Sequence, residues 1–202
     1  RGMNVNLHRW HRHGDVAEEF FDLGDELGML SEPEGAYWGV YGIPDLLGYS
    51  DWDDPVWAAN LAEHYRSWAR RHRNHPSIAL WSIENETFCA TTRPDAMVDR
   101  FIAFGRALKE EDPTRPVTFH GSANGGYHDK RGDIEIVNFH YPSDGKVADW
   151  RKEFGGRPCI NGEFQSYPPA FLMAAPKAED AAKATDAMCA YIEHWTDTYR
   201  GM

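Results

Sequence analysis

The sequence predicts an α/β fold built on a parallel sheet and, within that class, a TIM (β/α)8 barrel. Short apolar strands alternate with amphipathic helices, which is typical of parallel βαβ units. Polar and ionisable residues follow the predicted strands, and no glycine-rich phosphate fingerprint does, which favours a barrel over a doubly wound sheet. Six strands are predicted where a closed barrel needs eight, so we expect a partial barrel with a strand missing at each end.

Length and charge limit the classes of protein that fit. The 202 residues suffice for one domain with a substantial core, so we treat residues 1–202 as a single partial domain. A formal charge of -11 argues against nucleic acid or an anionic membrane as a partner, and no apolar run is long enough to cross a bilayer. The start lacks an initiator methionine and a signal peptide, so we expect further domains in a longer polypeptide. Localisation and oligomeric state stay open.

The N-terminal elements are predicted from short patterns. Residues 3–8 alternate apolar and polar residues and predict a strand. Asp15 opens a capping-box pattern for a helix that ends at Gly28. Residues 29–32 predict the next strand, and residues 33–53, rich in glycine, proline and aromatic residues, predict a long loop. The apolar stripe predicted for the helix consists of Val16, Phe20, Leu23 and Leu27.

The rest of the chain repeats the alternation of helices and strands. Asp54 and Pro55 form a cap and first-turn pair for a helix with an apolar face. Thr92 begins another helix, which Asp112 and Pro113 end. Strands are predicted at residues 78–83, 116–120, 134–140 and 158–163, and further helices at 146–154 and 181–199.

Two of the predicted strands end in a carboxylate. The stretch NHPSIALWSIENE runs through an apolar strand and stops on Asn85 and Glu86, and PCINGEF reaches Glu163 in the same way. A carboxyl group at the end of a buried strand is poorly solvated, which favours its protonated form near neutrality and suits a general acid. Two such carboxyl groups are the minimum needed to cleave a glycosidic bond.

These stretches resemble the catalytic barrel of the family 2 glycoside hydrolases, the retaining family of β-galactosidase, β-glucuronidase and β-mannosidase. NHPSIALWSIENE is similar to the acid/base segment of that family. FFDLGDELGMLSEPEG, DPTRPVTFHGS, IVNFHYPSD and CINGEF resemble its second helix with third strand, and its fifth, sixth and seventh strands. The order and spacing match over nearly the whole chain. The resemblance implies that the chain carries barrel strands two to seven and lacks the first and eighth.

The resemblance also implies roles for individual residues. Glu86 takes the place of the acid/base, Asn85 that of the asparagine that binds the sugar 2-hydroxyl, and Glu163 that of the nucleophile. Tyr141 resembles the tyrosine that orients the nucleophile. Arg9 stands for the arginine beside the nucleophile, although HRWHRH departs from the usual pattern at that strand.

Further candidates have two readings each. His120 and His140 either donate hydrogen bonds to sugar hydroxyls or are polar residues satisfied within the barrel rim. Trp38 either lines a sugar subsite or packs within its own loop. Glu32 could offer a metal donor together with nearby histidines, but their irregular spacing argues against it, and we expect neither metal nor organic cofactor. Those histidines are His8, His11 and His13.

The sequence therefore predicts a retaining O-glycosyl hydrolase that cleaves β-linked sugars by double displacement at two carboxylates. The alternatives are a carbohydrate-binding barrel without turnover and an inactive fragment of a larger glycosidase. A carboxyl separation of roughly 5 to 5.5 Å would favour retention, and one of roughly 6.5 to 9.5 Å would favour inversion. The sequence does not name the sugar, but no cluster of basic residues marks a uronate clamp, which favours a neutral one.

Overall fold

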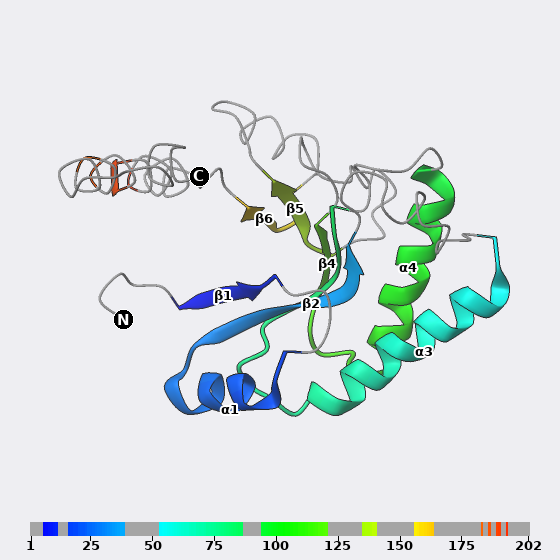
Figure 1. The fold of residues 1–202 in the computed structure, drawn as a ribbon, viewed down its shortest axis with the longest axis horizontal. Coiled ribbons are helices and arrows are strands. Elements are labelled where there is room, and N and C mark those ends of the chain that lie inside the picture. Colours follow the sequence, from blue (N-terminus) through cyan, green and yellow to red (C-terminus); the bar gives the residue numbers. More distant parts are fainter. Residues whose placement is uncertain are drawn as a thin grey trace.

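The structure is a computed structural model that describes residues 6–11, 16–38, 53–86, 94–120, 135–140 and 156–163, with residues 183, 186, 189, 190 and 193. The side chains of residues 36–38, 94, 95 and 139 fall outside this description. The elements of the described part (Figure 1) are β1 (Leu7–Trp10), α1 (Glu18–Leu27), β2 (Leu30–Trp38), α3 (Pro55–His72), β3 (Trp81–Asn85), α4 (Pro94–Glu111), β4 (Val117–His120), β5 (Val137–His140) and β6 (Cys159–Glu163). Among these helices, none has the length and apolar character that a membrane crossing requires.

All the paired strands run parallel, in the order in which they follow one another along the chain. One sheet has the order β1-β2-β3-β4, and a second sheet pairs β5 with β6. A parallel bridge between Thr118 and Ile136 joins the first sheet to the residues just before β5. Sequential parallel strands with helices between them confirm the predicted α/β architecture. The expected absence of the first and eighth barrel strands stays a prediction.

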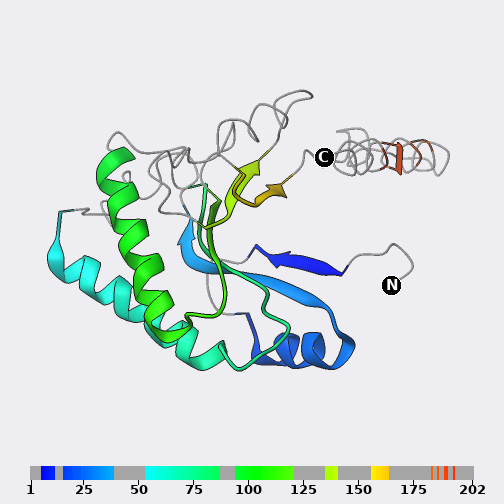
Figure 2. The same cartoon turned by 180° about the vertical axis from the view of Figure 1, so that it is seen from behind.

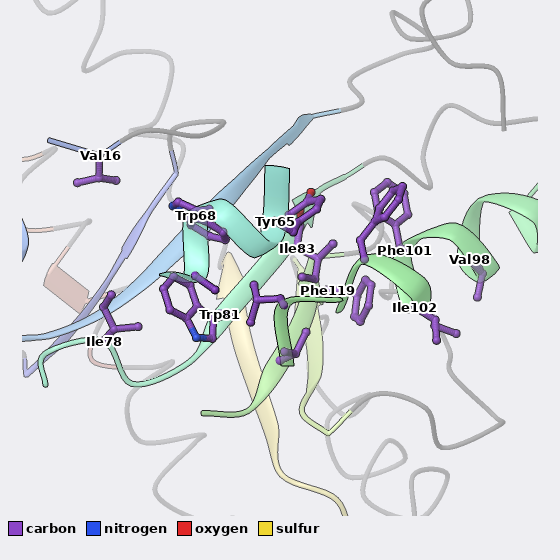
Figure 3. Packing of buried hydrophobic residues seen from close by; sticks show 14 of the residues in the cluster. Val16, Tyr65, Trp68, Ile78, Trp81, Ile83, Val98, Phe101, Ile102 and Phe119 are labelled. Carbon is purple, nitrogen blue, oxygen red and sulfur yellow. The ribbon is translucent and has the colours of Figure 1, made fainter. Parts of the chain in front are cut away.

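Helices α3 and α4 pack side by side along one flank of the sheet (Figures 1 and 2). The alternation of β3 turns Trp81 and Ile83 toward these helices, where Figure 3 shows them beside Tyr65 and Trp68. The rings of Trp68 and Trp81 meet edge to face with centroids 4.8 Å apart. The hydroxyl of Tyr65 donates to the Ile83 carbonyl at 2.5 Å. The same alternation turns Ser82 and Glu84 to the opposite side, away from the helices.

The turn after α4 fixes the start of β3. The Asp112 carboxylate accepts hydrogen bonds from the Trp81 indole at 2.8 Å, from the Arg115 guanidinium at 2.7 Å and from Thr114. Burial acts to raise the pKa of Asp112, but these donors outweigh it and lower that pKa to about 2. Arg115 also donates to the Ile78 carbonyl at 2.6 Å. The turn therefore ties the chain before β3 to the chain before β4.

Helix α1 differs from its prediction at one end and on its buried face. It begins at Glu18 with Ala17 as the N-cap and no side-chain cap, so the predicted cap at Asp15 is wrong. It ends, as predicted, at Gly28, which has a φ of +66°. Phe21 and Gly24 are the buried positions of the helix. The helix packs so closely at Gly24 that a Cβ atom there would lie 3.0 Å from both Ser77 and the Met29 carbonyl oxygen. Of the predicted stripe, Val16 is buried in the core as expected, just before the helix. The other three residues face outward, with exposed fractions of 47% for Phe20, 50% for Leu23 and 59% for Leu27.

Strand β2 is longer than the prediction of residues 29–32 and takes up the first part of the predicted loop. Its pairing with β3 extends the strand through Gly35 to Trp38. A Cβ atom at Gly35 would lie 2.5 Å from the Ile83 carbonyl and 2.7 Å from the Tyr65 ring. Glycine at this position therefore permits the close approach of β2, β3 and α3. The rest of that loop and the helix predicted at 146–154 lie outside the described residues, as does most of the one at 181–199.

We expect Gly35→Ala to lower the free energy of unfolding by about 1 to 3 kcal/mol, because the added methyl group overlaps backbone and ring atoms. Urea titration followed by tryptophan fluorescence measures this change. Gly105→Ala in α4 is the matched control, since its new methyl group would meet Val117 at an ordinary 3.4 Å. Alanine is the better helix former by about 0.8 to 1 kcal/mol, so this control should be neutral or stabilising. Equal losses in the two variants would contradict the close approach at Gly35.

Candidate active site

The carboxyl-terminal ends of the strands bring polar side chains from every part of the sheet to one edge. Parallel strands that run in register present these ends together, which is where α/β folds carry their ligand sites. Each of the described strands contributes at least one such residue, and Glu86 follows β3 directly. The side chains gathered at or near these ends are Arg9, Glu34, Asn85, Glu86, His120, His140 and Glu163, and Glu32 joins them from the first half of β2.

Arg9 lies at the centre of this group. Its guanidinium donates to Glu34 at 2.9 Å from Nε, to Glu163 at 2.6 Å from Nη1, and to the Asn85 side-chain oxygen from Nη2. It also reaches the Gly162 carbonyl at 3.3 Å. Burial opposes the charge of Arg9, but the charges of Glu34 and Glu163 outweigh burial and raise its pKa. One cation therefore holds β1, β2, β3 and β6 together at this edge.

Glu34 is the buried carboxylate that keeps Arg9 in place. Its side chain is fully buried, and His11 Nδ1 lies 3.3 Å from Oε2. Burial alone would raise the pKa of Glu34, yet the contact with His11 and the charge of Arg9 lower it. The hydrogen bond to Glu34 in turn raises the pKa of His11. Glu34 is therefore an ionised counter-charge for Arg9 rather than an acid.

The two predicted carboxyl groups lie next to each other on either side of His140. His140 Nδ1 is 3.3 Å from Glu86 Oε1 and 3.8 Å from Glu163 Oε2. The nearest donor atoms of these three side chains all lie within 4.8 Å of one another. Glu86 has a φ of +50°, the left-handed region that residues other than glycine seldom adopt. This backbone conformation ends the alternation of side chains between the two faces of β3 at Glu86, the residue that follows the strand.

Behind this pair lies a buried hydrogen-bonded chain. His120 Nε2 is 2.6 Å from Glu32 Oε1, and His120 Nδ1 is 2.7 Å from His140 Nε2. Glu32, His120 and His140 are at most 2% exposed. The side-chain nitrogen of Asn138 contacts the His120 ring, and its oxygen accepts from the Gly162 amide at 3.0 Å. The chain therefore leads from the interior of the sheet to Glu86.

Burial sets the charges along this chain. It raises the pKa of Glu32 to about 7, against the opposing influence of Arg9 and His140. Burial also lowers the pKa of His120 well below its usual value, and the positive charge of Arg9 acts in the same direction. His120 is consequently neutral around pH 7, where Glu32 can hold or release a proton.

The structure brings six of the predicted residues together and leaves two undescribed. Arg9, Asn85, Glu86, His120, His140 and Glu163 all belong to the cluster. Tyr141 and the side chain of Trp38 lie outside the described residues. The roles predicted for these residues stay predictions. His120 and His140 contact each other, and His120 contacts Glu32. These contacts agree with the second interpretation given for the two histidines, that of polar residues satisfied within the protein.

Sequence reasoning missed Glu32 and Glu34 as members of the site. The sequence suggested Glu32 only as a metal donor beside His8, His11 and His13, whereas in the structure its carboxyl group contacts His120. The signal was available, because residues two apart on a strand share a face and a carboxylate on each marks that face as polar. The donor set of Glu86, His140 and Glu163 has the makeup of a cation site, and the expectation that no metal is needed stays a prediction.

The sequence matches a family model and several curated proteins. A family model described as "Glycosyl hydrolases family 2, TIM barrel domain" matches residues 1–200. A putative beta-glucuronidase of Formosa agariphila is 32% identical over 138 residues, which cover 68% of this chain and 11% of that protein. Beta-galactosidase 2 of Enterobacter cloacae is 36% identical over 106 residues, or 52% of this chain and 9% of that protein. The chain thus spans about a tenth of the length of these curated relatives.

Solved structures share the fold at lower identity. A Bifidobacterium dentium beta-glucuronidase complexed with coumarin-3-O-glucuronide has a TM-score of 0.61 and 23% identity, covering 79% of this chain and 27% of that one. An Eisenbergiella tayi GH2 beta-galacturonidase bound to galacturonate has a TM-score of 0.59 and 24% identity, covering 77% of this chain and 28% of that one.

We expect Arg9→Gln to lower the free energy of unfolding by about 3 to 5 kcal/mol at neutral pH, because Glu34 would stay buried without its cation. The stabilisation from Glu34 is fully present above the pKa that Glu34 has in the unfolded chain, and it is lost as the pH falls through the lowered pKa of the folded state. In the variant, protonation of Glu34 on acidification removes the uncompensated charge, so the gap to wild type should narrow toward acid pH. Urea titrations at several pH values measure this gap.

The control for this prediction is Arg66→Gln, which removes an exposed cation. Arg66 pairs with Glu110 at 2.8 Å on the outer surface of α3 and α4. Such exposed pairs contribute less than about 1 kcal/mol, without a marked pH dependence near neutrality. A gap for Arg9→Gln that stays constant from neutral to acid pH would contradict the role assigned to Glu34.

Proposed function

The chain belongs to the TIM barrel domain family of the family 2 glycosyl hydrolases, and we propose that it carries the catalytic carboxyl pair of a retaining β-glycosidase. The observation that carries this proposal is the approach of Glu86 and Glu163, whose nearest carboxyl oxygens lie within 4.8 Å. Inverting enzymes need roughly 6.5 to 9.5 Å between the two groups to admit a water molecule, whereas retaining enzymes need roughly 5 to 5.5 Å. The separation therefore favours double displacement at two carboxylates.

In the first step, Glu163 is the nucleophile. Its Oε1 is held by Arg9 at 2.6 Å, which favours the ionised form and leaves Oε2, on the side of His140, to attack the anomeric carbon. A bond forms between this oxygen and the sugar while the glycosidic bond breaks. Glu86 gives its proton to the departing oxygen. Arg9 thus orients the nucleophile as well as compensating its charge.

In the second step, Glu86 acts as a base. It takes a proton from a water molecule, which attacks the anomeric carbon and releases Glu163 as a carboxylate. Asn85 is oriented by the hydrogen bond that its oxygen accepts from Arg9, so that its amide nitrogen would donate to the sugar 2-hydroxyl. The same residue that fixes the nucleophile thereby also fixes the expected substrate-binding amide.

The remaining predicted residues have supporting roles in the proposal. Tyr141 would orient the nucleophile, and Trp38 would line a sugar subsite. His140 lies against both carboxyl groups, whereas His120 is buried behind it and would act through it. The whole polypeptide, with further domains, would determine the sugar.

The relatives differ in the sugars that their names give, so the sugar has to be found by experiment. Arg9 contacts Glu34, Glu163 and Asn85 and is thereby engaged, which favours a neutral sugar over a uronate among the described groups. The full-length polypeptide should be tested on 4-nitrophenyl β-galactoside, β-glucoside, β-mannoside, β-glucuronide and β-galacturonide. Binding of a sugar without turnover of any of these would support the non-catalytic alternative.

We expect Glu163→Gly to reduce kcat by about 10⁴-fold or more, because it removes the group that forms the covalent intermediate. Glu86→Gln should reduce kcat/KM by about 10² to 10⁴-fold for leaving groups that need protonation, and far less for 2,4-dinitrophenyl glycosides. Steady-state kinetics on both substrate types measure this difference.

The matched control is Glu110→Gln, a carboxyl group that is 61% exposed on the outer surface and should leave kcat/KM unchanged. Product analysis by NMR adds a second criterion, since the first-formed sugar should keep the β configuration. An initially formed α anomer, or wild-type rates in Glu163→Gly, would exclude the proposed mechanism.

A further inference from the structure

The buried chain behind the carboxyl pair has the connectivity of a proton relay. Three contacts join four side chains in sequence: 2.6 Å from Glu32 to His120, 2.7 Å from His120 to His140, and 3.3 Å from His140 to Glu86. Each imidazole takes part through both of its nitrogens. Because neutral imidazole donates at one nitrogen and accepts at the other, the direction of one hydrogen bond fixes the direction of the next.

Only two directions are consistent with neutral histidines. If Glu32 is ionised, it accepts from His120 Nε2, His120 Nδ1 accepts from His140 Nε2, and His140 Nδ1 accepts the proton of Glu86. If Glu32 is protonated, every bond reverses, and His140 Nδ1 donates to an ionised Glu86. The first direction suits the acid form of Glu86 and the second suits its base form.

We propose that Glu32, His120 and His140 form a relay that moves one proton between Glu86 and Glu32 and thereby couples the acid/base group to a buried carboxyl group. In the forward direction, the proton of Glu86 passes to His140 Nδ1. The proton on His140 Nε2 passes to His120 Nδ1, and the proton on His120 Nε2 passes to Glu32. The net charge of the relay does not change, since one proton enters and one leaves each imidazole.

The surroundings of the relay suit this exchange. Arg9 from β1, Glu34 from β2 and Glu163 from β6 are the charged groups that act on it from the neighbouring strands. Their opposing charges, together with burial, leave His120 neutral and give Glu32 a pKa of about 7. A proton can therefore reside on Glu32 at neutral pH while its direct partner His120 is uncharged.

The geometry around His120 keeps the relay aligned. Asn138 contacts both ring nitrogens of His120 and is itself held by the Gly162 amide at 3.0 Å. A Cβ atom at Gly162 would overlap the His120 ring and the Asn138 oxygen. The glycine that precedes Glu163 thus permits the close packing of the relay against β6.

Glu32 and His120 touch neither carboxyl group of the catalytic pair, so they are positioning residues.

The test is the pH profile of kcat/KM in the full-length polypeptide, with Glu32→Gln and His120→Gln. Glutamine keeps a hydrogen-bonding group at each position but cannot pass a proton along the relay. We expect the alkaline limb to move to lower pH by about one unit in each single variant, because Glu86 loses the coupling that retains its proton. The double variant should shift no further than either single variant.

Two results would overturn the relay. If both profiles overlay that of the wild type, with only a uniform loss of rate, the two residues are merely structural. If Glu32→Gln shifts the limb while His120→Gln does not, Glu32 acts through its electric field and no proton passes through His120. Should either variant fail to fold, ¹⁵N NMR of histidine-labelled wild type decides, since His120 and His140 should change tautomer together in one titration and not separately.

This inference rests on the assignment of Glu86 as the acid/base, and the two can fail separately. Glu86→Gln tests the assignment through the leaving-group dependence of kcat/KM, whatever happens at Glu32. A strong effect of Glu86→Gln together with unshifted profiles in the relay variants removes the relay and leaves the glycosidase mechanism in place. An unaffected Glu86→Gln variant removes both.

Discussion

The pairing of Arg9 with the carboxylates of Glu34 and Glu163 is the constraint on which the rest of the site depends. Glu34 and Glu163 come from different strands, and without a shared cation their charges would repel each other in a poorly solvated space. A planar guanidinium can reach both carboxylates and the Asn85 amide at once, which a lysine ammonium cannot do with the same fixed geometry. Through this one group, the register of the sheet determines where the Glu163 carboxylate points.

The elements and the carboxyl pair were predictable because local rules govern them. Strand β3 ends at Asn85, next to Glu86, since an apolar run of strand length has to stop where polar residues begin. Asp54 caps α3 through the Val56 amide at 2.8 Å, as the cap and first-turn pattern predicts. The family resemblance supplied the order of the strands, and it also supplied Arg9 despite its unusual sequence context.

The remaining features depend on contacts between distant residues. Glu32 and His120 are separated by 88 positions, and only the pairing of the strands brings them within 2.6 Å. The outward turn of Phe20 follows from the small residue Gly24, which lets α1 pack closely on the segment around Ser77. The extension of β2 through Pro33 and Gly35 follows from its pairing with β3, which overrides local propensity. The periodicity of the sequence does not identify contact partners that lie far apart along the chain.

The left-handed backbone at Glu86 bears on how such a site evolves. Glycine adopts this conformation without steric cost, so the fold itself would be served as well or better by glycine at position 86. Selection for chemistry, rather than selection for stability, would therefore retain a glutamate there. If that selection relaxed, the Glu86 carboxyl group could disappear in a descendant without harm to the fold. Catalytically silent members with an intact fold are thus an accessible evolutionary outcome for this architecture.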